Sequence, residues 1–124
     1  MFFIIILLLF VCCHVSARSP ELVHFNKQTN IDQNEPLMLL CNSLKGSKPI
    51  QFEWFKDSQK IFSQNEYSID FKSSGSILTI DKVQQHHEGN YSCYASNSDG
   101  SDIVSTILMV KGLLSDRDVA LEFF

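Results

Sequence analysis

Four cysteines and one pair of adjacent histidines are the side chains with the most versatile chemistry in this chain. A thiol can form a disulfide, bind a metal ion or act as a nucleophile, and the compartment decides which is favoured. If Cys12 and Cys13 leave with an N-terminal leader, Cys41 and Cys93 are the pair that remains. An even pair in a chain bound for an oxidising compartment is most simply a disulfide. We therefore expect a bridge between Cys41 and Cys93 and no free thiol for catalysis.

His86 and His87 are the histidine pair that could bind a metal ion. Adjacent residues on an extended or turn backbone point apart, and no cysteine or third histidine lies nearby in sequence, so a solvated corner is favoured over a metal site. The acids Asp70, Asp81 and Glu88 are scattered at expected strand ends, whereas acid–base catalysis needs a pair of carboxylates in a cleft. No hydrolase, zinc-protease, phosphate-loop or dinucleotide motif is present. We expect no metal, no cofactor, no small-molecule substrate and no catalysis.

Asn90-Tyr91-Ser92 matches the acceptor pattern for N-glycosylation. Tyr91 is expected to point into the core, so Asn90 should point outward and be reachable. Ser92 belongs to an expected paired strand, which would hinder modification. The sequence leaves the occupancy of Asn90 open.

The chain begins with an unbroken apolar run, MFFIIILLLFV, from Met1 to Val11. A membrane-spanning helix needs about 20 such residues, so this run is too short for a stable anchor. It fits the apolar core of a secretory signal peptide, and Val15-Ser16-Ala17 supplies a small-residue cleavage site. No Lys or Arg precedes the run, which departs from the usual pattern. We expect residues 1–17 to be a signal peptide, with a buried apolar element as the alternative, and the mature chain to be secreted or at the cell surface.

The formal net charge of −4 argues against nucleic acid or an anionic membrane surface as a partner. The C-terminal segment, residues 112–124 (GLLSDRDVALEFF), lies outside the strand pattern described next. It is too short to span a membrane and lacks the spacer and long hydrophobic end of a lipid-anchor signal. We expect no transmembrane anchor in this chain and assign no role to this segment.

The central part of the chain consists of short segments with alternating apolar residues, separated by clusters of Gly, Pro, Asn and Ser. Leu39 shares a face with Cys41, and Leu78 shares a face with Ile80, whereas no stretch keeps a helical period. Two sheets packed face to face would bury both sets of inward residues, so we expect an all-β, two-sheet antiparallel sandwich. The expected strands are Glu21–Phe25, Pro36–Ser43, Ile50–Lys56, Gln59–Phe62, Tyr67–Phe71, Ser76–Val83, Asn90–Ser96 and Ile103–Val110.

Cys41, Trp54 and Cys93 form the set that best identifies this sandwich. Trp54 follows Cys41 by one turn and one strand, so both can point into one core. The bridge would close a loop of about 52 residues between opposite sheets, and loop closure of this length contributes roughly 4 kcal/mol of stability. The Trp54 indole would pack against the bridge. Tyr91 precedes Cys93 by two residues, where its hydroxyl can bond the backbone of the preceding corner.

Residues 19–111 resemble an immunoglobulin-superfamily domain of the intermediate (I-set) type, and we place the domain at residues 18–111. The segments that carry the resemblance are LLC at the first cysteine, FEWFK at the tryptophan, SILTI, and GNYSCYASNSDG at the second cysteine. The stretch between tryptophan and second cysteine is too short for the two extra strands of a variable-type domain. One position departs from the family, because His87 stands where the family usually has an Asp that tightens the corner.

The same alternation predicts an exposed face built from three neighbouring strands. With Trp54, Cys93 and Leu108 inside, the residues beside them on each strand point outward. Aromatic and methionine side chains are enriched at interfaces, and large exposed apolar patches mark interaction sites. We expect this face to bind a protein partner, which includes a second copy of the chain. Its residues are Phe55, Tyr94, Ile107 and Met109.

A rival patch is expected on the other sheet, where Met38, Leu40 and Ile77 point outward. That patch could instead pack on the N-terminal strand or on the C-terminal segment. Which of the two faces binds a partner is a question of structure.

The resemblance implies an extracellular protein-binding module for cell–cell adhesion or guidance-receptor recognition. A secreted immune-recognition or inhibitory protein is the alternative, because no anchor is visible in this chain. Intracellular muscle repeats share the I-set pattern, and the expected signal peptide argues against that class. The fold alone does not choose among these functions.

Overall fold

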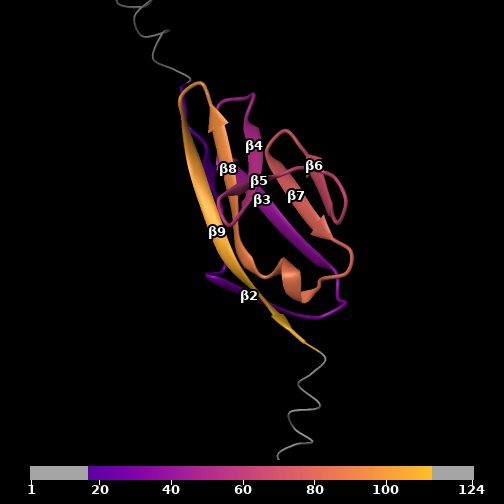
Figure 1. The fold of residues 1–124 in the computed structure, drawn as a ribbon. Coiled ribbons are helices and arrows are strands. Elements are labelled where there is room, and N and C mark those ends of the chain that lie inside the picture. The colour runs from indigo at the N-terminus through magenta and orange to yellow at the C-terminus, as the bar shows by residue number, and fades with distance from the viewer. Residues whose placement is uncertain (1–16, 113–124) are drawn as a thin grey trace, which may run out of the picture.

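The computed structural model describes residues 17–112, which form two sheets packed face to face (Figure 1). The elements are β1 (Glu21–Leu22), β2 (Gln28–Asp32), β3 (Leu37–Lys45), β4 (Gln51–Lys56), β5 (Gln59–Ile61), β6 (Tyr67–Phe71), β7 (Gly75–Ile80), the 3-10 turn η1 (Gln85–His87), β8 (Gly89–Asn97) and β9 (Gly100–Lys111). One sheet has the order β1-β3-β7-β6, and the other has the order β2-β9-β8-β4-β5. The expected all-β sandwich is confirmed.

Two of the sequence predictions concern segments that are almost wholly outside the described residues. The expected signal peptide, residues 1–17, is described only at Ala17, and the C-terminal segment, residues 112–124, only at Gly112. The domain boundaries at residues 18 and 111 stay predictions. Within residues 17–112 there is no helix of the length and apolarity needed to cross a bilayer.

Strand β2 is the described strand that the apolar alternation does not predict. Its sequence, QTNID, contains a single large apolar side chain, the half-buried Ile31. The strand is held by parallel pairing with β9, from Gln28 opposite Ile107 to Asp32 opposite Lys111. A strand that depends on pairing with a distant segment leaves little signal in its own residues.

Two expected strands run three residues past their observed ends, and side chains that pack on the core explain why the apolar pattern continues there. The first strand ends at Leu22, and Phe25 beyond it leaves the sheet to stack on Trp54 with ring centroids 6.1 Å apart. Strand β7 ends at Ile80, and Val83 beyond it is buried in the turn, where its N–H donates to the Glu35 carbonyl at 2.9 Å. Both residues contact the core because of loop packing rather than sheet pairing.

The core is organised around the disulfide between Cys41 of β3 and Cys93 of β8, which joins the two sheets and confirms the expected pairing. Trp54 is 1% exposed and lies directly opposite Cys93 in the β4–β8 register, so its indole sits beside the bridge. The indole N–H donates to Ser76 Oγ of the opposite sheet at 2.9 Å. Leu39 and Leu78, which are paired across β3 and β7, are both buried.

The corner before β8 is closed by Tyr91, which is fully buried and whose hydroxyl donates to the His87 carbonyl at 2.7 Å. Burial raises the pKa of Tyr91 far above its ordinary value, and the nearby Tyr67 hydroxyl adds to the shift. The phenol is therefore a permanent donor at physiological pH. The corner bond expected from the spacing of Tyr91 and Cys93 is present.

Candidate interaction site

Phe55 of β4 and Tyr94 of β8 lie half-buried on the outer face of the five-stranded sheet. Tyr94 is paired with Ile103 of β9, which is 56% exposed. The three side chains line a hollow of about 330 Å³ together with Glu53, Ser58 and Ser92. An apolar centre with a polar rim is the usual composition of a surface that receives a side chain from a protein partner.

Ile107 and Met109 lie farther along β9 and do not line this hollow. They are 49% and 43% exposed, and Ile107 lies between Asn90 of β8 and Gln28 of β2. The predicted four-residue face is therefore divided into a hollow and a separate apolar stretch with polar neighbours. Ile103 was missing from the prediction, although it has the same outward register as Ile107 and counting back along the strand would have found it.

The rim of the hollow carries weak polar contacts that a partner could exchange for its own. Glu53 is 3.6 Å from the ammonium of Lys60, and both side chains are partly exposed. Exposed ion pairs of this kind contribute about 0–1 kcal/mol to stability. Ser92 and Ser105 share a hydrogen bond of 2.7 Å between their hydroxyls. These groups can therefore be redirected toward a partner with little loss of stability.

The rival patch lies on the outer face of the four-stranded sheet, where Met38 and Leu40 are 68% and 56% exposed. Leu40 is paired with the half-buried Ile77 of β7, and Leu44 extends the patch along β3. The N-terminal strand β1 pairs with β3 along its edge and does not cover these residues. The rival patch is thus apolar and accessible among the described residues, and it follows the two neighbouring strands β3 and β7.

Asn90, the expected glycosylation acceptor, is exposed at the start of β8. Its backbone N–H donates to Asp57 Oδ1 at 2.9 Å, and its carbonyl accepts from the Asp57 N–H at 2.8 Å. Ser92 is paired within the sheet, as the sequence predicted. Asn90 lies opposite Ile107 and two residues before Ser92, which lines the hollow, so a glycan there would stand between the hollow and the Ile107 and Met109 stretch.

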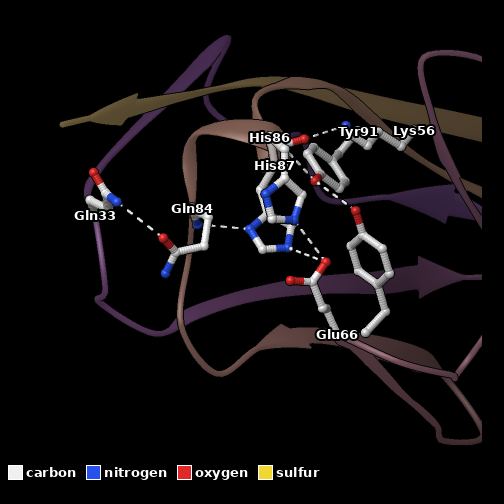
Figure 2. A network of polar contacts seen from close by, with 8 residues as sticks. Gln33, Lys56, Glu66, Gln84, His86, His87 and Tyr91 are labelled. Atoms are coloured by element: carbon white, nitrogen blue, oxygen red, sulfur yellow. Dashed lines mark hydrogen bonds and ion pairs between the residues drawn. The ribbon is translucent and has the colours of Figure 1, made fainter.

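The expectation that His86 and His87 point apart into solvent is wrong. Their rings lie 4.2 Å apart, and His87 is fully buried (Figure 2). Both Nε2 atoms face the same oxygen of Glu66, at 2.8 Å from His86 and 3.3 Å from His87. The rings meet because η1 turns His87 inward to accept a backbone bond, while the exposed His86 folds over the same carboxylate.

The Glu66, His86 and His87 cluster has the composition of a zinc site, and its ligand atoms lie within 4.8 Å of one another. The backbone N–H of Gln84, however, donates to His87 Nδ1 at 2.8 Å. Nδ1 is therefore unprotonated and Nε2 carries the proton in the neutral ring. A histidine that binds a metal through Nε2 needs its proton on Nδ1, where it is donated to an acceptor. The cluster is arranged as a hydrogen-bonded corner rather than a metal centre.

Comparisons with known proteins place this geometry in a family. A model described as an immunoglobulin domain matches residues 19–97. The cell adhesion molecule DSCAML1 of Mus musculus is 34% identical over 85 residues, which are 68% of this chain and 4% of that protein. The limbic system-associated membrane protein of Mus musculus is 29% identical over 104 residues, which are 84% of this chain and 30% of that protein. The chain thus spans less than a third of the length of these relatives.

Solved structures agree with the sequence comparisons. The I-band fragment I67-I69 of titin has a TM-score of 0.71 at 28% identity and covers 78% of this chain and 34% of its own. The Ig7 domain of Dscam1, isoform 5, has a TM-score of 0.69 at 27% identity and covers 75% of this chain and 97% of its own. The similarity extends over most of the described sandwich.

Proposed function

The chain belongs to the immunoglobulin-domain family, whose members are non-catalytic binding modules, and from this premise we propose that it recognises a protein at the cell surface or in the extracellular space. The observation that carries the proposal is the apolar hollow between Phe55, Tyr94 and Ile103. These side chains are ordered by sheet pairing and at least partly exposed to solvent, so a partner would bury them without reorganising the domain.

The class of recognition that we propose is cell–cell adhesion, of the homophilic or heterophilic kind. The relatives support it, since one is named a cell adhesion molecule and another a membrane protein. The bridge between Cys41 and Cys93 supports an extracellular location, because structural disulfides persist in oxidising compartments. A freely secreted recognition protein would use the same face, and the two differ in whether the product stays with the cell.

We predict that the double substitution F55S/Y94S weakens partner capture and self-association by at least tenfold, because it removes both aromatic walls of the hollow. The measurement is binding of the purified full chain to cells and to itself, by sedimentation and surface capture. The matched control is M38S/L40S, which removes two exposed apolar side chains from the opposite face.

The two double variants distinguish which of the two faces binds the partner. Lost binding in F55S/Y94S with normal binding in M38S/L40S supports the proposed face. The reverse pattern assigns binding to the four-stranded sheet. Unchanged binding by a folded F55S/Y94S chain would reject the hollow as the site. Thermal unfolding of each variant shows whether a loss of binding has a structural cause.

We also propose that Asn90 carries an N-linked glycan, since it is exposed and followed by Tyr91 and Ser92. Chain secreted from eukaryotic cells should lose mass on amidase treatment, and N90Q chain should start at the lower mass. The same variant should bind through the hollow at least as tightly as the wild type, because the glycan would stand beside Ser92 at the edge of the hollow. An unchanged mass after amidase treatment would show that the site is unoccupied.

A further inference from the structure

The corner between β7 and β8 is held by a buried histidine in one protonation state. His87 is fully buried, and its Nδ1 accepts the Gln84 N–H at 2.8 Å (Figure 2). Its Nε2 lies 3.3 Å from a Glu66 oxygen and makes no hydrogen bond. The His87 carbonyl in turn accepts the Tyr91 hydroxyl. His87 therefore takes part in two bonds: its neutral ring holds the turn η1 through Gln84, and its carbonyl holds Tyr91 of β8.

We propose that His87 makes this corner an acid-sensitive element of the domain: protonation of Nδ1 breaks the bond to Gln84 and opens the turn between β7 and β8. The added proton would lie between two nitrogen donors, so the bond cannot survive in the cationic form. The cation would also be buried with one partly exposed carboxylate as its partner. A solvated histidine at this position would have neither constraint.

The groups around His87 oppose its charging more than they favour it. Burial lowers the pKa of His87, the charge of His86 lowers it further, Glu66 raises it, and Lys56 lowers it. Tyr67 packs against the ring edge-on at 5.8 Å between centroids, and Tyr91 donates to the backbone. The ionisable groups packed around the corner are Lys56 and Asp57 at the end of β4, Glu66 and Tyr67 at the start of β6, His86 and Glu88 of the turn, and Tyr91 of β8.

The sign of the pH dependence follows from the lowered pKa. Near pH 6.5 the unfolded chain takes up a proton on this histidine, whereas the folded chain resists it. The stabilisation is therefore complete above that pH and is lost as the pH falls below it. Glu66 also has a lowered pKa, chiefly because of its bond to His86, so its contribution is lost only at pH values below its ordinary 4.5. The range from about pH 7.5 to about pH 5.5 isolates the histidine effect.

Opening of this corner would break hydrogen bonds at one end of the sandwich. Gln84 Oε1 accepts from Gln33 Nε2 at 3.0 Å, and Gln85 Nε2 donates to the Val110 carbonyl at 3.0 Å. Glu88 accepts the Val110 N–H at 3.0 Å. The turn thus ties the β2–β3 connection to the end of β9. An extracellular domain meets this pH range on uptake into acidic compartments, and this consequence rests on the proposed function. The chemistry of the corner is independent of the proposed function.

The test compares thermal unfolding of the full chain at about pH 7.5 and about pH 5.5 for wild type and H87N. Asn can accept the Gln84 N–H and does not titrate, as the Asp usual at this position would also accept it. We expect the wild-type Tm to fall by about 4–8 °C more than that of H87N over this range. H24Q is the matched control, since His24 is exposed and makes none of the contacts of the corner described above, and it should keep the wild-type dependence.

A second measurement on the wild type keeps the test independent of variant folding. Hydrogen exchange of the Gln84 amide should be protected at the higher pH and, after correction for intrinsic rates, lose at least tenfold in protection at the lower. Parallel pH profiles of wild type and H87N, or unchanged Gln84 protection, would overturn the proposal. Stabilisation by added Zn²⁺ that is absent in H87N would also overturn it, because it would place the proton of His87 on Nδ1. None of these outcomes depends on partner binding.

Discussion

Replacing both Cys41 and Cys93 by alanine is expected to lower the free energy of unfolding by about 4 kcal/mol. The bridge closes a sequence separation of 52 residues, and its loss returns that loop entropy to the unfolded chain. For a domain of this size the change corresponds to a fall of roughly 20 °C in Tm. Urea unfolding is readily followed by fluorescence, because Trp54 is the single tryptophan of the chain and lies beside the bridge.

Reduction of the wild type supplies the control for this prediction. Reduced wild type should unfold at nearly the same urea concentration as the double variant, and the variant should not respond to reductant. A double variant as stable as the oxidised wild type would contradict the assignment of the bridge as the main covalent stabiliser. Both forms are expected to keep the β structure in the absence of urea, since the remaining core residues stay apolar.

The second large effect is expected from W54A, which should lower the free energy of unfolding by about 3–5 kcal/mol. The indole is 1% exposed, stacks with Phe25 and donates to Ser76 Oγ. Its removal leaves a cavity beside the disulfide and removes a hydrogen bond between the two sheets. Circular dichroism is the suitable measurement, because this variant has no tryptophan fluorescence.

Two further substitutions serve as comparisons: S76A removes the acceptor of the indole N–H, and F71A removes an aromatic ring outside the core. S76A leaves the indole N–H buried without its acceptor and should cost about 1–3 kcal/mol. F71A removes an aromatic ring that is 60% exposed and should cost less than about 0.5 kcal/mol. A loss in W54A no larger than that in F71A would contradict the central place of the indole in the core.

The histidine pair shows what local reasoning could not reach. Adjacent side chains on an extended or turn backbone were expected to point apart, and that rule predicted a solvated corner. In the structure a 3-10 turn replaces the extended backbone, and Glu66 approaches from a different strand connection. The contact between residues 66 and 87 depends on how the two sheets stack. The residue pattern within either segment does not predict this contact.

The candidate face was predicted in part, for a related reason. Alternation correctly placed Phe55 and Tyr94 outward, because side-chain direction along a strand is a local property. Which outward residues meet depends on the register between strands. The pairing of Tyr94 with Ile103, and of Ile107 with Asn90, moved the hollow away from Ile107 and Met109.

The sequence by itself determined the class of fold, the pairing of Cys41 with Cys93 and the buried positions of Trp54 and Tyr91. These features follow from period-2 alternation and from cysteine count, which are written into neighbouring residues or into the chain as a whole. Only the tertiary structure decided the parallel strand β2, the hollow on the outer face and the protonation state of His87. The strand and the hollow depend on the register between segments far apart in the chain, and the protonation state of His87 depends on the geometry of the 3-10 turn, which apolar alternation does not encode.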